Sequence, residues 1–259
     1  MVKTYFNNVH ILIYVAIFIV GLIVGKFVAW CNIRLPEKKK IFSKDFFEEN
    51  KNGIKANYIF MIITGTVYIA LLYRFGLNKE NLLKNLELIK FLTLSPMLIL
   101  ALSIDMKHRI IPNRLNLTIL ETGLIITFIY GITNVNMAKD YILGMLAGGA
   151  IFGFITLIGG LIFGKEAMGL GDIKFTGAIG LYFGTYSISE ISLLSFLIAA
   201  IFSILILTFR LITKNKDEYI PFGPFLAMSA MICIFIPVGM VFDKFLLICK
   251  MISEKIPLI

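Results

Sequence analysis

Residues 98–105 read Leu-Ile-Leu-Ala-Leu-Ser-Ile-Asp, an apolar run that ends in the carboxylate of Asp105. A second acid, Asp172, ends the segment Gly169-Leu170-Gly171-Asp172 just before another apolar run. An ionisable group at the edge of a hydrocarbon core is energetically costly, so each aspartate is a candidate functional residue. Two such acids on the same membrane face could form one catalytic pair.

The composition indicates an integral membrane protein. Hydrophobic residues make up 58% of the 259 residues and charged residues 16%, with a mean hydropathy of +0.88. Soluble domains average about half apolar and one quarter charged. Lysines and arginines in cytoplasmic loops account for the net charge of +9. Nucleic-acid binding is not expected, because no basic stripe alternates with aromatic residues.

Apolar runs recur along the whole chain. Because a helix needs about 20 residues to cross a bilayer, the sequence predicts an all-α, polytopic transmembrane helix bundle that forms one domain over residues 1–259. We interpret the first run as a retained span, since it exceeds the apolar region of a signal peptide. The last run could tilt or break at Pro237, and seven crossings would also fit. The eight expected spans are 10–31, 57–75, 88–104, 115–134, 141–163, 173–188, 190–212 and 222–249.

The distribution of basic residues predicts the orientation. With the N-terminus outside, thirteen lysines and arginines lie in the inner segments 32–56, 105–114, 164–172 and 213–221, and six lie in the outer segments. Positive residues favour the cytoplasmic side. Two crossings separate Asp105 from Asp172, so both acids are expected on the cytoplasmic face. The alternative for each is a solvated helix-end carboxylate, or one paired with Lys107, Arg109 or Lys174.

The glycines before Asp172 favour a role in peptide binding. Gly169 and Gly171 lack side chains, permit backbone angles closed to other residues and let a second extended backbone come close. The alternative interpretation is a simple bend between the loop and the next helix.

Four short motifs now stand in order along the chain. They are residues 25–36, which end in Arg-Leu-Pro; 105–113, in which Asp is followed by Ile-Pro; 169–174, Gly-Leu-Gly-Asp-Ile-Lys; and 220–225, Ile-Pro-Phe-Gly-Pro-Phe. Together they resemble the prepilin peptidases, membrane aspartic proteases of the Gly-x-Gly-Asp type. The resemblance implies that Asp105 and Asp172 are catalytic, supported by Gly169, Gly171 and Lys174. It also implies cleavage of the short, positively charged leader from type IV prepilins or pseudopilins, just before the apolar helix of the substrate. The cleavage is expected at the cytoplasmic face of a prokaryotic cell membrane, inner or plasma.

One departure from the family concerns the first loop. Bifunctional members carry a cytoplasmic domain there, with paired Cys-x-x-Cys motifs that bind zinc, and they also N-methylate the product. Residues 32–56 instead form a short basic loop without cysteine, and the three cysteines of the chain, Cys31, Cys233 and Cys249, lack metal-ligand spacing. No metal and no cofactor are expected, and methyl transfer is in question.

The expected chemistry follows from the two carboxyls. Two carboxyls that share one water cannot easily both ionise, so they hold one proton between them. The ionised partner takes a proton from water as it attacks the peptide carbonyl, and the protonated partner donates to the developing oxyanion.

Other functions and roles stay open at this level. The same acids could serve an ion- or proton-coupled transporter as relay groups, although transporter sites lie near the midplane within inverted repeats. Lys174 could tune the pair or attract substrate, but a cytoplasmic anchor is the simpler interpretation. His108 is interpreted as a solvated loop residue. In the first loop, Glu37, Asp45, Glu48 and Glu49 are the candidates for contact with a basic leader.

Overall fold

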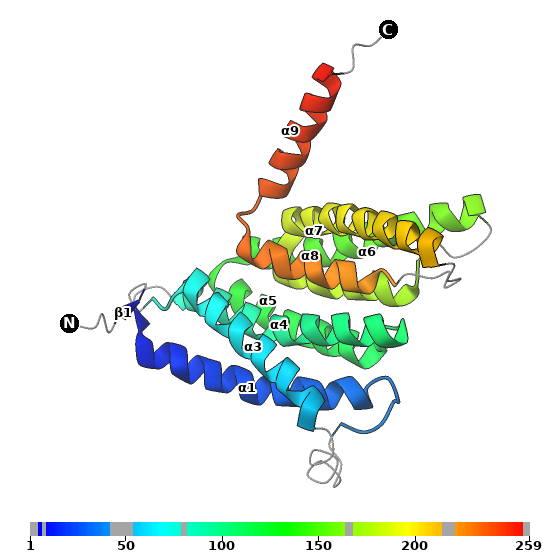
Figure 1. Cartoon of the computed structure of the whole chain (residues 1–259). Helices are drawn as coiled ribbons and strands as arrows, with labels where there is room; N and C mark the ends of the chain where they lie inside the picture. Colours follow the sequence, from blue (N-terminus) through cyan, green and yellow to red (C-terminus); the bar gives the residue numbers. More distant parts are fainter. Residues whose placement is uncertain are drawn as a thin grey trace.

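The computed structural model describes residues 5–6, 9–41, 54–78, 82–163, 168–213 and 221–255. Within these ranges the protein is a helical bundle, preceded by a two-residue antiparallel pair, β1 (Tyr5–Phe6) with β2 (Val9–His10) (Figure 1). The expected helical fold class is confirmed. The helices are α1 (Ile11–Arg34), α3 (Ile54–Phe75), α4 (Leu82–His108), α5 (Asn113–Thr133), α6 (Val135–Phe163), α7 (Leu170–Thr213), α8 (Gly223–Phe235) and α9 (Met240–Lys255).

In this part of the chain, six helices are long and apolar enough to cross a membrane, and the bent pair α8 and α9 would add a seventh crossing. The span within α7, Leu170–Thr208, has 39 residues. A straight helix of that length would be about twice as long as the hydrocarbon core is thick. Gly184, with φ 78° and ψ 178°, breaks it into two legs. Counting both legs gives the eight crossings expected from the sequence, with the break five residues before the predicted outer segment at 189.

The first leg of α7 packs tightly against α6 through glycines. A Cβ on Gly144 would lie 2.5 Å from the carbonyl oxygen of Gly180, and a Cβ on Gly180 would overlap the backbone of Gly144. A Cβ on Gly148 would lie 2.7 Å from the carbonyl oxygen of Thr176. Small residues that let helix backbones touch are a main source of stability within membranes. This contact holds in place the helix that begins beside Asp172.

Gly180→Ala is therefore expected to destabilise the protein. The added methyl group has backbone in its way, and overpacking of this kind costs about 1–3 kcal/mol. We expect a lower thermal unfolding midpoint in detergent, measured by loss of helical circular dichroism. The matched control is Gly153→Ala on α6, where an added Cβ meets nothing within 4 Å. Equal midpoints for the two variants would contradict the importance of the glycine contact.

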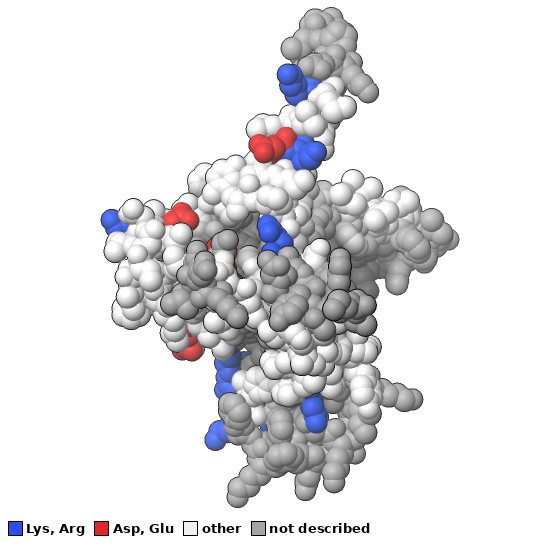
Figure 2. Space-filling view, turned by 90° about the vertical axis from the view of Figure 1, so that its left-hand side faces the viewer, with Lys and Arg blue, Asp and Glu red and all other residues white. Residues whose placement is uncertain are grey.

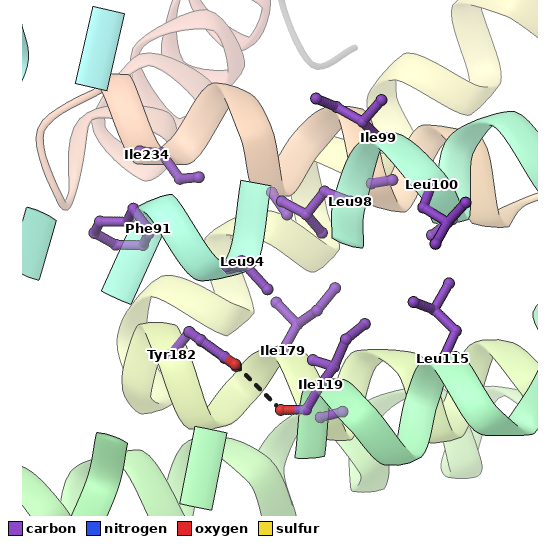
Figure 3. Packing of buried hydrophobic residues seen from close by; sticks show 14 of the residues in the cluster. Phe91, Leu94, Leu98, Ile99, Leu100, Leu115, Ile119, Ile179, Tyr182 and Ile234 are labelled. Atoms are coloured by element: carbon purple, nitrogen blue, oxygen red, sulfur yellow. Dashed lines mark hydrogen bonds between the residues drawn. The ribbon is translucent and has the colours of Figure 1, made fainter. Parts of the chain in front are cut away.

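The helices that carry the two aspartates, α4 and α7, share one apolar core with α5. Figure 3 shows Leu94 and Leu98 of α4 facing Ile119 of α5 and Ile179 of α7. All four side chains are at most 1% exposed. The hydroxyl of Tyr182 donates a 3.2 Å hydrogen bond to the carbonyl oxygen of Ile119, which ties α7 to α5. The ends of these helices are therefore placed by one continuous apolar core.

The last expected span is broken, as the position of Pro237 suggested. α8 and α9 meet at 105°, and α9 projects from the bundle (Figure 1). The buried carboxylate of Glu190, on the second leg of α7, fixes the bend, because it accepts hydrogen bonds from the backbone amides of Gly239 and Val241 at 3.0 and 3.1 Å. Leu246, Leu247, Ile248 and Met251 of α9 are exposed.

The outer surface suits a lipid environment. Large apolar side chains face outward on α5 and α6, with Ile132 73% and Leu161 86% exposed. Exposed apolar surface on this scale is typical of contact with a membrane. Figure 2 looks instead onto the end of the bundle where α3 ends and α6 begins, and a few charged residues lie there among uncharged ones.

Candidate active site

Asp105 and Asp172 occupy opposite kinds of helix end. Asp105 lies three residues before the last residue of α4, and Asp172 lies in the first turn of α7. Both are buried, with 4% and 8% of their surfaces exposed. Since an unpaired acid in such a place is costly, the backbone contacts around each carboxylate decide how it is held.

The two acids line the same cavity, which has a volume of about 350 Å³. The charge of Asp105 acts electrostatically on Asp172. All five residues singled out in the sequence reach this cavity: Asp105, Gly169, Gly171, Asp172 and Lys174. The sequence placed the segments around Asp105 and Asp172 on the same membrane face. The structure places both segments at the same cavity. The remaining lining residues are Arg109, Ile110, Ile111, Asn113, Leu170, Pro221 and Phe222.

Asp105 is held by the start of α8. The backbone amide of Gly223 donates a hydrogen bond to the Asp105 carboxylate. A Cβ at Gly223 would lie 2.5 Å from Oδ2 of Asp105 and 2.9 Å from Cδ1 of Ile111. Only glycine therefore allows this approach. From its Pro-Phe-Gly-Pro segment, Gly223 was expected mainly to shape the entry to the last span, with a role in holding substrate as the alternative; its contact with Asp105 was not expected.

The segment before Asp172 is held from two sides. Nδ2 of Asn116, on α5, donates a 3.1 Å hydrogen bond to the carbonyl oxygen of Gly171. The backbone amide of Gly169 donates to the Asp172 carboxylate. Asn116 is a residue that the motifs did not identify, because its importance depends on a contact 55 positions away in the sequence.

The two glycines of this segment do not use unusual backbone angles. The glycines with positive φ among the described residues are Gly76, Gly184 and Gly239, so Gly169 and Gly171 do not use the wider range of backbone angles that glycine permits. A Cβ on Gly171 would meet Ile111 at no less than 3.6 Å, which is ordinary contact. What glycine provides here is open space beside the acids.

The basic neighbours have distinct positions. Nζ of Lys174 donates a 3.3 Å hydrogen bond to Oδ1 of Asn113 on the rim of the cavity. Arg109 also lines the cavity and has φ 57°, the left-handed conformation that often follows a helix end. His108 is not among the cavity-lining residues and acts electrostatically on Glu37.

The Arg-Leu-Pro motif anchors the chain that follows α1. Arg34 is buried, stacks 4.3 Å from the centre of the Trp30 ring and donates a 2.8 Å hydrogen bond to the carbonyl oxygen of Lys40. Arg114, at the start of α5, donates a 3.0 Å hydrogen bond to the carbonyl oxygen of Lys39. The expected basic loop 32–56 thus begins close to α5. Residues 42–53, which include Asp45, Glu48 and Glu49, lie outside the described residues.

Among the described residues, no group of three or more histidine, cysteine or acidic side chains is arranged to hold a metal ion. Cys31, Cys233 and Cys249 are free thiols. The absence of a zinc site therefore stays a prediction for the whole chain.

The fold and the cavity define a polytopic helical membrane protein with two buried acids at adjoining helix ends. Residues 92–204, which include both acids, match the family model for the type IV leader peptidase family. This segment is similar to that family and contains the second and third of the four motifs, and the expected resemblance to the prepilin peptidases is confirmed.

Three curated relatives illustrate the similarity, and each is named "Prepilin leader peptidase/N-methyltransferase". The chain is 32% identical to the protein of Aeromonas salmonicida over 143 residues, 55% of this chain and 47% of that protein. It is 29% identical to the protein of Xanthomonas campestris over 177 residues, which are 67% of this chain and 56% of that protein. It is 35% identical to the protein of Legionella pneumophila over 140 residues, which are 53% of this chain and 46% of that protein. The matches thus span about half the length of these relatives. No solved structure matches the chain significantly.

Proposed function

We propose that the protein is a membrane aspartic endopeptidase that removes the leader from type IV prepilins or pseudopilins. The observation that carries the proposal is the shared cavity, where two buried carboxylates from different helices interact electrostatically. The match of residues 92–204 to the type IV leader peptidase family model supports the substrate class.

The carboxyl pair supplies the hydrolytic chemistry. With one proton between them, the ionised carboxylate takes a proton from a water molecule, whose oxygen adds to the peptide carbonyl carbon. The protonated carboxyl stabilises the developing oxyanion. Collapse of the tetrahedral adduct breaks the C–N bond, and the departing nitrogen receives a proton from the carboxyl pair, which took one from the attacking water. The acid and base roles are not assigned individually, because a coupled pair titrates as one unit.

The surroundings of the pair suit this reaction. The Gly223 amide orients Asp105, while Asn116 and the Gly169 amide hold the segment that carries Asp172. Such supporting contacts limit the motion of reacting groups, and orientation is a large part of catalysis. The open space beside Gly169 and Gly171 leaves room for an extended substrate backbone.

The site is proposed to face the cytoplasm. Both acids lie at the end of the bundle where α4 ends and α7 begins, the end to which the sequence assigns the excess of positive charge. This placement also argues against a transporter, whose coupling groups would lie near the midplane beside a helix break. The break in α7 is at Gly184, twelve positions beyond Asp172.

The direct test is co-expression with a candidate prepilin in a host that lacks its own peptidase. We expect a mobility shift equal to the leader length, and mass spectrometry of the mature N-terminus will show whether a methyl group has been added. A panel of prepilins and pseudopilins that all stay uncut, with the protein correctly inserted, would overturn the proposal.

A further inference from the structure

A second cavity, of about 430 Å³, lies among α3, α4 and α8 and is lined only by apolar side chains. We call it the α4–α8 groove. Its wall on α3 includes Ile63, which is 41% exposed, and its wall on α8 includes Ile232, which is 36% exposed. The groove is therefore accessible from the bilayer. The lining residues are Ile63, Val67, Leu98, Ile99, Leu102, Ala227, Met228, Met231 and Ile232.

The groove leads to the candidate active site along two helices. On α4, Leu98, Leu102 and Asp105 are separated by four and three residues, so they lie on one helix face. On α8, Ala227 and Met231 follow Gly223 at intervals of four and share its face. Gly223 and Asp105 are hydrogen-bonded to each other. The apolar residues that α4 and α8 contribute to the groove therefore lead to the hydrogen bond between Gly223 and Asp105.

We propose that the α4–α8 groove receives an apolar helix of the peptide substrate, immediately after the bond that is cut. This inference rests on the proposed function and names the surface that recognises the membrane-embedded part of the substrate. The occupant is a membrane helix rather than a soluble peptide, because every lining side chain is apolar and the lining residues of α3 and α4 lie within candidate membrane spans.

The geometry also sets how much of the helix is recognised. Leu98 and Asp105 are seven residues apart, which corresponds to about 10 Å along a helix. A substrate helix that lies in the groove with its N-terminal end at Asp105 would therefore contact it over roughly its first two turns. Its chain would run parallel to α8 and antiparallel to α4. Met228 and Met231 are flexible, so the groove can adapt to different apolar sequences.

Narrowing the groove tests the proposal. Ile63→Trp and Ile232→Trp each place a large ring at its rim, and the matched control is Ile62→Trp on the same turn of α3, which is 55% exposed and is not a lining residue. Each variant is assayed on a full-length prepilin and on a short peptide that spans the cleavage site but lacks the apolar helix. We expect a rise in KM of about tenfold for the full-length prepilin only. The lost contacts bind the substrate equally in the ground state and the transition state, so kcat should not change.

Crosslinking identifies the occupant. A photoreactive benzoylphenylalanine replaces Ile232, or Ile62 as the control, in an Asp172→Asn background that keeps the prepilin intact. The expected product is a crosslink to the first two turns of the prepilin helix from position 232 only. Crosslinks only to lipid or to a second copy of the chain would overturn the proposal, as would unchanged KM values in both groove variants. If the unmodified protein cuts no prepilin, the proposed function fails instead, so the two failures are distinguishable.

Discussion

Asp105→Asn and Asp172→Asn are each expected to abolish leader cleavage. Asparagine keeps the size of the side chain but can neither accept a proton from water nor donate an acidic one. Loss of a general acid–base group lowers a rate by about 10² to 10⁴, and both groups line the same cavity. The measurement is the initial rate of prepilin cleavage by purified protein in detergent or liposomes.

A double variant tests whether the two acids act as one unit. Residues that act as one unit show strongly non-additive losses, so Asp105→Asn combined with Asp172→Asn should be no slower than the worse single variant. Glu121→Gln serves as the control, because Glu121 is an exposed acid on α5. Helical content and membrane insertion should be equal in all four proteins. Substantial activity in either single aspartate variant would exclude the pair mechanism.

Gly223→Ala is expected to lower the cleavage rate by about 100-fold. A displacement of a catalytic group by about one ångström can have an effect of this size. The added methyl group would lie 2.5 Å from the Asp105 carboxylate, so either the acid or the start of α8 has to move. The loss should appear mainly in kcat, since the substrate-binding surfaces remain.

The matched control for Gly223→Ala is Gly149→Ala on α6, where a Cβ has no neighbour within 4 Å. Its rate and its unfolding midpoint should match those of the unmodified protein. If Gly223→Ala retained full activity with an unchanged kcat, the close approach of α8 would have no part in positioning Asp105.

Much of this architecture could be predicted from the sequence because the bilayer imposes simple rules. Backbone polar groups must be satisfied within each spanning segment, so apolar runs of sufficient length predict helices, and an acid such as Asp105 stands out at their ends. The confirmed helical fold follows from this constraint. The pairing of two acids across 67 positions was suggested by parity and by the motifs, and the structure places both in one cavity.

Other features depended on contacts that the sequence does not reveal. The break within α7 was expected at 189, because the apolar run continues through Gly184, whose positive φ becomes evident only in the folded chain. The roles of Gly223 and Asn116 likewise require knowledge of the helix that lies opposite. At Gly169 and Gly171 the open space expected from glycine is present, and the wider range of backbone angles that glycine permits is not used.

The shortness of α8 has a consequence for the surrounding lipid. Its 13 residues rise about 20 Å, roughly 10 Å less than the hydrocarbon core is thick. Because α9 turns away at 105°, the bilayer has to become thinner beside α8, at a cost of a fraction of a kcal/mol per Å of mismatch. We therefore expect the membrane to be thinner on this side, next to the groove, and the activity to depend on the acyl-chain length of the surrounding lipids.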